Sequence, residues 1–311
     1  MFRVKTFNAI SQKGLSRFDT TRYEVGADVD SPDAYILRSH KLHGEAVPAG
    51  LLAVARAGAG VNNVPVEDYS KQGIVVFNTP GANANAVKEL VVAGMLLSCR
   101  DIAGGIDFVR NLEDEGDDAA LGKLLEGEKK RFAGGEIKGK TLGVIGLGAI
   151  GALVANVAVE LGMNVVGFDP ALSVEAAWRL SRRVEKMESI EALLARADFV
   201  SMHVPAIPQT KGLINAERLA QVKSGCVLLN FAREQVVDLN AVIDALDKGQ
   251  LARYVTDFPA GTLLKRNDVI PLPHIGASTA EAEENCAMMA ADQLMDYLEN
   301  GNIVNSVNFP A

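Results

Sequence analysis

Residues 141–151 read TLGVIGLGAIG, an apolar, β-branched run followed by glycines in the spacing GxGxxG. The pattern predicts a strand over Thr141–Ile145, then a tight turn, then a helix. Gly146 permits the turn, Gly148 lets the backbone approach a pyrophosphate, and Gly151 lets the helix pack closely on the sheet. Because the first N–H groups of such a helix are free to bind phosphates, the stretch predicts a dinucleotide site.

An acidic residue follows the next predicted strand. The helix over Ala152–Leu161 leads to an apolar run at Asn164–Phe168, and Asp169 stands 18 residues after Gly151. A carboxylate there accepts hydrogen bonds from the adenosine ribose and repels a 2′-phosphate, so the pattern predicts NAD rather than NADP. The alternative is a glycine-rich turn without a ligand, and the order strand, turn, helix, strand and acid argues against it.

Short apolar runs alternate with helical patterns on both sides of this motif. Such alternation predicts parallel sheets, and 311 residues suit about two domains. Long helices are predicted over 86–110 and 279–299. The predicted strands are Phe2–Phe7, Ala34–Arg38, Leu52–Arg56, Gly73–Asn78, Thr141–Ile145, Asn164–Phe168, Phe199–Met202, Cys226–Asn230, Tyr254–Thr256 and Val269–Pro271.

Composition excludes several classes of protein. Lys plus Arg is 31 and Asp plus Glu is 39, a net charge of −8 that disfavours nucleic-acid binding. Three separated cysteines without a CxxC pair predict neither a metal site nor disulfides, and favour a reducing cytoplasm. Residues 141–159 are uncharged, but their glycines favour strand, turn and buried helix over a membrane span. The N-terminus lacks the apolar run of a secretory signal.

Two polar residues follow predicted strands in the C-terminal half. Arg233 comes just after Cys226–Asn230, where a guanidinium can bind a carboxylate through two hydrogen bonds. The alternative is a surface salt bridge to Glu234 or Asp238. His274 follows another short strand, and imidazole is the usual acid or base for moving a hydroxyl proton near neutral pH.

The other histidines are weaker candidates for catalysis. His40 and His43 lie in a polar stretch and are expected at the surface. His203 ends the strand Phe199–Met202 and is a candidate for the cofactor crevice, with a structural role as the favoured alternative.

Three blocks in this order, GLGAIG at 146–151, FAREQVVD at 231–238 and PLPHIGAST at 271–279, resemble the D-isomer-specific 2-hydroxyacid dehydrogenases. The resemblance implies an α/β fold with two doubly wound parallel-sheet domains. A Rossmann NAD-binding domain (93–274) would be inserted into a flavodoxin-like substrate domain (1–92 plus 275–311).

The segments VARAGAGVNNV at 54–64, GIVVFNTPG at 73–81 and NGNIVNSVNFP at 300–310 resemble the members that act on 3-phosphoglycerate. This implies NAD-dependent oxidation to 3-phosphohydroxypyruvate, the first step of serine biosynthesis. It also implies a homodimer through the cofactor domain, with the helical segment 86–110 and a connector to Lys138 supplying much of the interface. Two alternatives stay open: a dehydrogenase of another D-2-hydroxyacid (glycerate, glyoxylate or lactate), or a non-catalytic NAD-sensing protein.

The resemblance also implies roles for individual residues. Arg233 would orient the substrate carboxylate and carbonyl, His274 would be the acid/base, and Arg56 would bind the substrate phosphate. Backbone N–H groups of Gly58, Ala59, Gly60 and Val61 would bind the carboxylate. The implied cofactor residues are Gly146, Gly148, Ala149, Ile150, Gly151, Asp169, His203, Phe231, Ala232, Arg233, Asp257, His274, Gly276 and Ala277, with Ala149 and Ile150 over the pyrophosphate and Ala232 and Asp257 at the nicotinamide.

The chain departs from the family pattern in two ways. No Glu occurs between Asp257 and His274, whereas the family pairs its catalytic His with a Glu there, so the orientation of His274 needs another source, for which Asp257 is the nearest candidate by sequence. Longer relatives continue into an amino-acid-binding regulatory domain. The sequence ends at Ala311, so no feedback through such a domain is expected.

Overall fold

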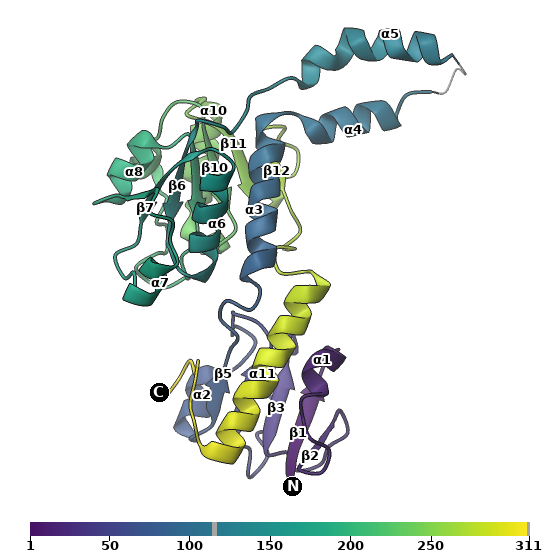
Figure 1. The fold of residues 1–311 in the computed structure, drawn as a ribbon, viewed down its shortest axis with the longest axis vertical. Coiled ribbons are helices and arrows are strands. Elements are labelled where there is room, and N and C mark those ends of the chain that lie inside the picture. The colour runs from purple at the N-terminus through teal and green to yellow at the C-terminus, as the bar shows by residue number, and fades with distance from the viewer. Residues whose placement is uncertain (114–116, 310–311) are drawn as a thin grey trace. The chain divides into compact units, whose positions relative to one another are not determined.

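The structure is a computed structural model that describes residues 1–113 and 117–309. The chain forms two compact units (Figure 1). Unit 1 comprises Met1–Ala86 and Ala277–Ala311, and unit 2 comprises Val87–Gly276. Unit 2 is thus an insertion in unit 1, and the chain passes between them at 86/87 and 276/277 rather than at the expected 92/93 and 274/275.

Unit 1 contains a five-stranded parallel sheet in the order β2-β1-β3-β4-β5, which is the flavodoxin-like order. Its strands are β1 (Phe2–Phe7), β2 (Tyr23–Gly26), β3 (Ala34–Leu37), β4 (Ala53–Arg56) and β5 (Val75–Phe77). Its helices are α1 (Gln12–Leu15), α2 (Val66–Lys71) and α11 (Ala280–Asn300).

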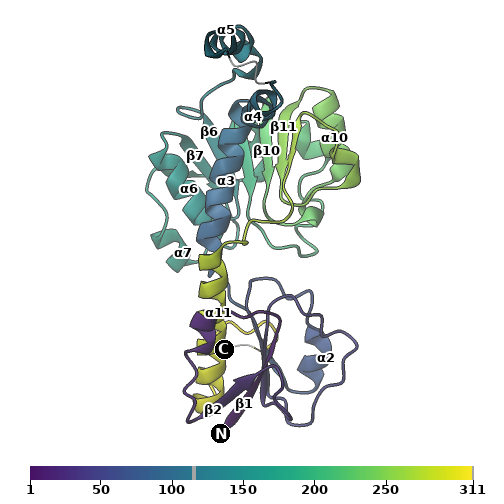
Figure 2. The same ribbon diagram turned by 90° about the vertical axis from the view of Figure 1, so that its right-hand side faces the viewer.

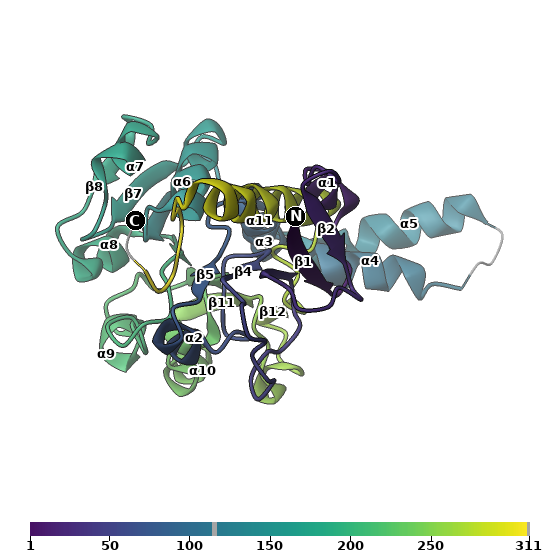
Figure 3. The same ribbon diagram turned by 90° about the horizontal axis from the view of Figure 1, so that it is seen from below.

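Helices cover both faces of this sheet (Figure 2). Successive strand residues point to opposite faces, so Ile36 packs with Ala290 of α11, while Tyr35 and Leu37 pack with Tyr69 of α2. Helix α1 lies beside α11 (Figure 3), where a Cβ added to Gly14 would come within 2.6 Å of Ala287. Burial on both faces explains why β3, β4 and β5 are nearly continuous apolar runs.

Unit 2 contains a seven-stranded parallel sheet in the order β12-β11-β10-β9-β6-β7-β8, the Rossmann order extended by one strand. Its strands are β6 (Thr141–Ile145), β7 (Asn164–Phe168), β8 (Val184–Lys186), β9 (Phe199–Met202), β10 (Cys226–Asn230), β11 (Leu251–Thr256) and β12 (Val269–Pro271). The connecting helices include α6 (Ala149–Glu160), α7 (Val174–Trp178), α8 (Ile190–Arg196), α9 (Ala216–Leu219) and α10 (Leu239–Asp247).

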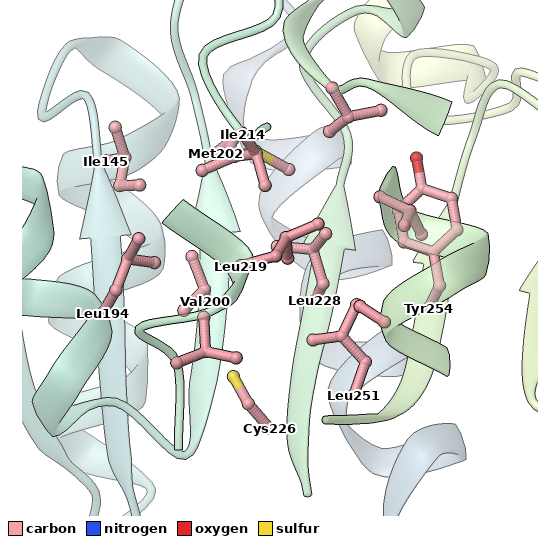
Figure 4. Packing of buried hydrophobic residues seen from close by; sticks show 14 of the residues in the cluster. Ile145, Leu194, Val200, Met202, Ile214, Leu219, Cys226, Leu228, Leu251 and Tyr254 are labelled. Carbon is pink, nitrogen blue, oxygen red and sulfur yellow. The ribbon is translucent and has the colours of Figure 1, made fainter. Parts of the chain in front are cut away.

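This sheet also separates two cores. On one face Leu228 of β10 packs with Val200, Leu194 and Leu219 (Figure 4). On the other, Leu229 packs with Met95 and the remaining members of a cluster supplied largely by α3 (Ala84–Cys99) and α6. The two cores fix the direction of every strand, and so the place where each strand ends.

Three sequence predictions about elements need correction. The helix predicted over 86–110 is two helices, α3 and α4 (Ile102–Arg110), because the Asp101 side chain accepts the Gly104 N–H at 3.0 Å and starts a new helix. A further helix, α5 (Asp118–Glu128), lies where no helix was predicted. Strands β2 and β8 were not predicted. Within the described parts of the chain, no helix is both long enough and apolar enough to cross a membrane.

Candidate active site

The predicted site residues of unit 2 follow six of its parallel strands. Since the carboxyl ends of parallel strands meet at one edge of the sheet, the topology brings these residues to the same edge. Along the strand order they are His274 after β12, Asp257 after β11, Arg233 after β10, His203 after β9, the glycine turn after β6 and Asp169 after β7. The strand order reverses between β9 and β6, the place where such sheets bind ligands.

The glycine turn is sterically obligatory at two of its three glycines. Gly146 has φ +88° and donates its N–H to Phe168 O at 2.9 Å. A Cβ on Gly151 would lie 1.9 Å from Gly146 O, so any side chain there would break the turn. At Gly148 no atom lies within 4 Å of an added Cβ, so this exposed glycine leaves open space in front of α6.

The first turn of α6 and Asp169 together fit an NAD molecule. The N-cap of α6 is Gly148, which supplies no side-chain hydrogen bond, so the helix N-terminus is left for a phosphate. The Asp169 carboxylate accepts the Leu147 N–H at 2.8 Å through one oxygen and the Ala171 N–H at 2.9 Å through the other. Each oxygen keeps a lone pair for a ribose hydroxyl.

His203 is a half-buried residue whose imidazole nitrogens are turned away from solvent. Its Nε2 lies 2.8 Å from Ser201 Oγ, and its Nδ1 is buried without a partner among the described residues. Burial lowers the pKa of His203 to about 3, because a charged imidazole would lose its hydration. His203 therefore does not exchange protons near neutral pH, and its carbonyl lies close behind Gly146.

Arg233 is held by its backbone and leaves its guanidinium available. The buried Asn230 amide donates to Arg233 O at 3.0 Å, and its oxygen accepts the Ala232 N–H at 3.2 Å. The same amide donates to the Tyr254 hydroxyl at 3.3 Å, so the whole turn is fixed from the core. The Arg233 Nη1 donates to Ala232 O at 2.6 Å.

The surface salt bridge that the sequence left open for Arg233 does not form. Glu234 accepts a hydrogen bond from Gln235, and Asp238 caps α10 through the N–H groups of Asn240 and Ala241. Across residues 1–113 and 117–309, no carboxylate lies within salt-bridge distance of Arg233. A half-buried guanidinium without a counter-ion is suited to bind an anionic ligand.

His274 is exposed and lies at the end of β12 in a left-handed conformation, with φ +56°. Its ring contacts Phe258, with ring centroids 4.8 Å apart. The buried Asp257 carboxylate accepts the N–H groups of Ile275 and Gly276, each at 2.8 Å. Asp257 is therefore bound to the backbone that follows His274 and is not the partner of the imidazole.

The remaining predicted cofactor residues differ in how far they are exposed to solvent. Phe231 is 5% exposed, and its ring lies against Gly94 of α3, where a Cβ would come within 3.1 Å, so this side chain belongs to the core. Ala232 and Gly276 are buried, whereas Ala277 falls in unit 1 at the point where the chain leaves unit 2.

In unit 1, the predicted substrate residues gather at the carboxyl end of β4. Gly58 donates its N–H to Arg56 O, but the N–H groups of Ala59, Gly60 and Val61 meet no acceptor in the part of the chain that is described. The Arg56 guanidinium lies against Gly58, because a Cβ there would come 1.8 Å from Arg56 Nη1. A cation beside free N–H groups is a suitable environment for an anion.

Three functional candidates were missed in the sequence. Arg38 follows β3, its carbonyl accepts the Arg56 Nε–H at 3.0 Å, and its guanidinium pairs with Glu283 at 2.6 Å. Asn230 holds the Arg233 turn, and Phe258 contacts His274. Arg38 could have been identified from the sequence, because it ends a predicted strand just as Arg56 does. Asn230 and Phe258 could not, because their contacts depend on which strands are neighbours in the sheet. No group of three or more His, Cys, Asp or Glu among the described residues is arranged to hold a metal ion.

A Rossmann sheet with a glycine turn, an acid after the second strand and an uncapped helix N-terminus defines a dinucleotide-binding α/β protein. The family model "D-isomer specific 2-hydroxyacid dehydrogenase, NAD binding domain" matches residues 102–276. The chain therefore belongs to the D-isomer specific 2-hydroxyacid dehydrogenases, and the dinucleotide is NAD.

Among members of this family, the chain is similar in sequence to enzymes named D-3-phosphoglycerate dehydrogenase. The chain is 35% identical over 301 residues to D-3-phosphoglycerate dehydrogenase of Methanocaldococcus jannaschii, covering 93% of this chain and 54% of that protein. It is 36% identical over 287 residues to the enzyme of the same name from Synechocystis, covering 89% and 49%. The chain thus spans about half the length of these curated relatives.

Solved structures give the same result for the fold. NAD+-bound 3-phosphoglycerate dehydrogenase from Entamoeba histolytica has a TM-score of 0.76 and 25% identity, covering 100% of this chain and 99% of that one. D-mandelate dehydrogenase from Rhodotorula graminis has a TM-score of 0.81 at 24% identity, covering 100% and 98%. The second is a likeness of fold only.

Proposed function

We propose that the protein catalyses reversible, NAD-dependent oxidation of 3-phosphoglycerate to 3-phosphohydroxypyruvate, the first step of serine biosynthesis. The observation that carries the proposal is the pair Arg233 and His274, which follow β10 and β12 at the edge of the cofactor sheet; neither is bound by a carboxylate of the described residues. The relatives named D-3-phosphoglycerate dehydrogenase support the same reaction.

The protein's own groups would bind, orient and move a proton. Arg233 binds the substrate carboxylate and polarises the C2 oxygen, so that negative charge developing there is stabilised. In oxidation, His274 takes the proton of the C2 hydroxyl, and in reduction protonated His274 returns it. NAD, when bound, supplies the acceptor or donor of the hydride. No metal is needed for these roles, since an arginine and an imidazole perform them.

The phosphate would be recognised in unit 1. Arg38 and Arg56 follow neighbouring strands, and the Arg56 guanidinium lies at the start of the Ala59–Val61 backbone. Two arginines suit a phosphate, because planar guanidinium groups donate pairs of hydrogen bonds to its oxygens. Lactate and glycerate carry no group that requires these cations, so the arginines favour the phosphorylated substrate.

The test is NADH oxidation with 3-phosphohydroxypyruvate, with hydroxypyruvate and pyruvate measured in parallel. Wild type should strongly prefer the phosphorylated substrate. Arg56→Ala should raise the KM for that substrate roughly 10- to 100-fold, the scale of one lost charge-assisted hydrogen-bonded contact, and leave hydroxypyruvate almost unaffected.

Arg17→Ala is the matched control, since Arg17 is another unit 1 arginine and pairs on the surface with Asp292. It should retain the wild-type preference. Equal turnover of the unphosphorylated acids would be consistent with the family but would contradict 3-phosphoglycerate as the preferred substrate. NADH binding without turnover of any acid would favour the NAD-sensing alternative.

We also propose a homodimer formed through the helices α4 and α5, which form an arm in Figure 1. Neither helix has a buried residue in the described parts of the chain, and Ile106 and Val109 are about half exposed, as are Leu121 and Leu124. Covering these apolar side chains with a second copy would remove them from water. Sedimentation should give a dimer for wild type and a monomer for the double variant Ile106→Asp, Val109→Asp.

The cytoplasm is the proposed location. All three cysteines are free thiols, as suits a reducing compartment, and Cys226 and Cys286 are buried. A small phosphorylated acid as substrate and a nicotinamide cofactor also suit that compartment.

A further inference from the structure

We propose that the Phe258 ring and the turn bound by Asp257 position the His274 imidazole for proton transfer, in place of a carboxylate partner. The proposal rests on the proposed function, in which His274 is the acid/base. An acid/base group must be held within hydrogen-bond reach of the oxygen that it serves, and an error of about 1 Å can lower the rate 100-fold. The protein needs a device for this, because no Glu lies between Asp257 and His274.

The first part of the device fixes the backbone. His274 has φ +56°, a conformation that non-glycine residues rarely adopt without support. The support comes from Asp257, which is 3% exposed and accepts the N–H groups of Ile275 and Gly276, the two residues directly after His274. A Cβ on Gly276 would come 2.9 Å from Asp257 Oδ2, so the close approach needs a glycine. The direction of the His274 Cα–Cβ bond is therefore set by a buried carboxylate.

The second part fixes the ring. The Phe258 and His274 rings have centroids 4.8 Å apart and planes at 58°, a tilted contact of the kind that aromatic pairs prefer. Phe258 is itself held, because its N–H donates to the buried Thr256 Oγ1 at 3.0 Å and because Pro259 restricts its backbone. The segment that follows β11 thus holds His274 through two side chains: the Asp257 carboxylate binds the backbone after it, and the Phe258 ring contacts the imidazole.

This arrangement leaves the polar atoms of the imidazole for the reaction. Over residues 1–113 and 117–309, neither ring nitrogen of His274 has a hydrogen bond or ion pair. The proton that His274 gives or takes is therefore shared with no protein carboxylate. Phe258 does not touch the reacting atoms in this scheme, so it is a positioning residue.

The test compares Phe258→Leu with wild type in the reduction of 3-phosphohydroxypyruvate by NADH. We expect kcat to fall about 10-fold or more, with KM and the Kd for NADH within twofold of wild type. The solvent deuterium isotope effect on kcat should rise, because a misplaced imidazole makes the proton transfer limit the rate. Phe258→Tyr keeps the ring and should restore both kcat and the isotope effect.

Phe7→Leu is the matched control. Phe7 is also half buried and contacts a histidine, with 4.4 Å between its centroid and that of His40 in unit 1. Thermal unfolding and NADH binding check that each variant is folded. Unchanged kcat in Phe258→Leu, or a fall without a change in isotope effect, would overturn the positioning role while the activity itself stands. If the wild type turns over none of the acids, the proposed function is wrong, and the positioning role that rests on it is wrong with it.

Discussion

Each unit carries a histidine in ring contact with a phenylalanine after a parallel strand, and the two histidines are held differently. His40 in unit 1 lies 4.4 Å from the Phe7 ring, its Nε2 is 2.7 Å from Glu45, and its own N–H is held by Asn8. His274 in unit 2 has the ring contact with Phe258 but no carboxylate partner within the described parts of the chain, and its position comes from the residues beside it.

The difference shows how one side chain serves two purposes. An imidazole bound to a carboxylate has one nitrogen occupied and its charge partly neutralised, which suits a surface link between two loops. An imidazole fixed through backbone and ring contacts keeps both nitrogens for a ligand. The second arrangement is the one expected for a group that must exchange a proton at every turnover.

The largest expected difference between the two histidines is in turnover. His274→Gln removes the acid/base, so kcat should fall about 1,000-fold, within the usual range of such losses. His40→Gln removes a half-buried imidazole that also contacts a phenylalanine ring, and it should leave kcat within twofold. Steady-state kinetics of both variants measures this difference. A similar loss of kcat in the two variants would contradict the assignment of His274 alone as the acid/base.

A second pair of variants compares the turns that follow the strands. Asn230→Ala leaves Arg233 O and Ala232 N–H without their buried partner, so kcat should fall roughly 10- to 100-fold and the protein should lose about 1–3 kcal/mol of stability. Asn78→Ala removes one hydrogen bond to Ala59 O beside the proposed carboxylate site.

For Asn78→Ala we expect a higher KM with kcat nearly unchanged, because the loop that it holds binds substrate without taking part in proton transfer. Kinetics and urea unfolding of both variants would separate the two effects. A fall in kcat for Asn78→Ala would show that the unit 1 loop acts in the transition state as well.

A smaller effect concerns His203, the third kind of histidine environment. Its pKa is lowered to about 3 by burial, so the native state does not take up a proton that the unfolded chain binds below about 6.5. This contribution to stability is complete above pH 6.5 and is lost as the pH falls toward 3. Between pH 7 and pH 5 the cofactor-free protein should lose about 1–2 kcal/mol through this group.

Urea unfolding of His203→Gln between pH 7 and pH 5 should show a flatter dependence on pH. Ser201→Ala, which keeps the imidazole and removes its hydrogen-bond partner, should retain the wild-type slope. An unchanged slope in His203→Gln would mean that His203 is reached by solvent protons in the native state.

Much of the fold was predictable because most of its strands are buried on both faces. Such strands are continuous apolar runs, and Thr141–Ile145, Phe199–Met202 and Cys226–Asn230 were predicted with their observed bounds. Strands β2 and β8 were missed because both are short edge strands, and Val184–Lys186 carries two exposed charged residues. The division of the helix at Asp101 was missed because apolar residues continue beyond it.

The sequence singled out candidate site residues only where a glycine or a polar residue comes soon after a strand. The glycine turn, Asp169, Arg233 and His274 have this signal. Asn230 lies inside β10, and Phe258 is an apolar side chain, so neither stands out as a polar residue after a strand. Their contacts come from spatial neighbours, because β11 lies between β10 and β12: Tyr254 of β11 bonds Asn230, and Phe258 contacts His274. No spacing along the chain specifies that order.

The insertion of unit 2 into unit 1 has a consequence for synthesis. The unit 1 core contains Cys286, Ala290 and Leu294 of α11, and Val76 of its edge strand β5 is paired with Val307 and Asn308. Unit 2 is complete once Gly276 has left the ribosome, whereas the first 86 residues must wait for the last 35. Domains usually form in the order in which they are made. Here unit 1 closes only after unit 2 has been made, so the strands within residues 1–86 stay without the α11 side of their core for longer during synthesis.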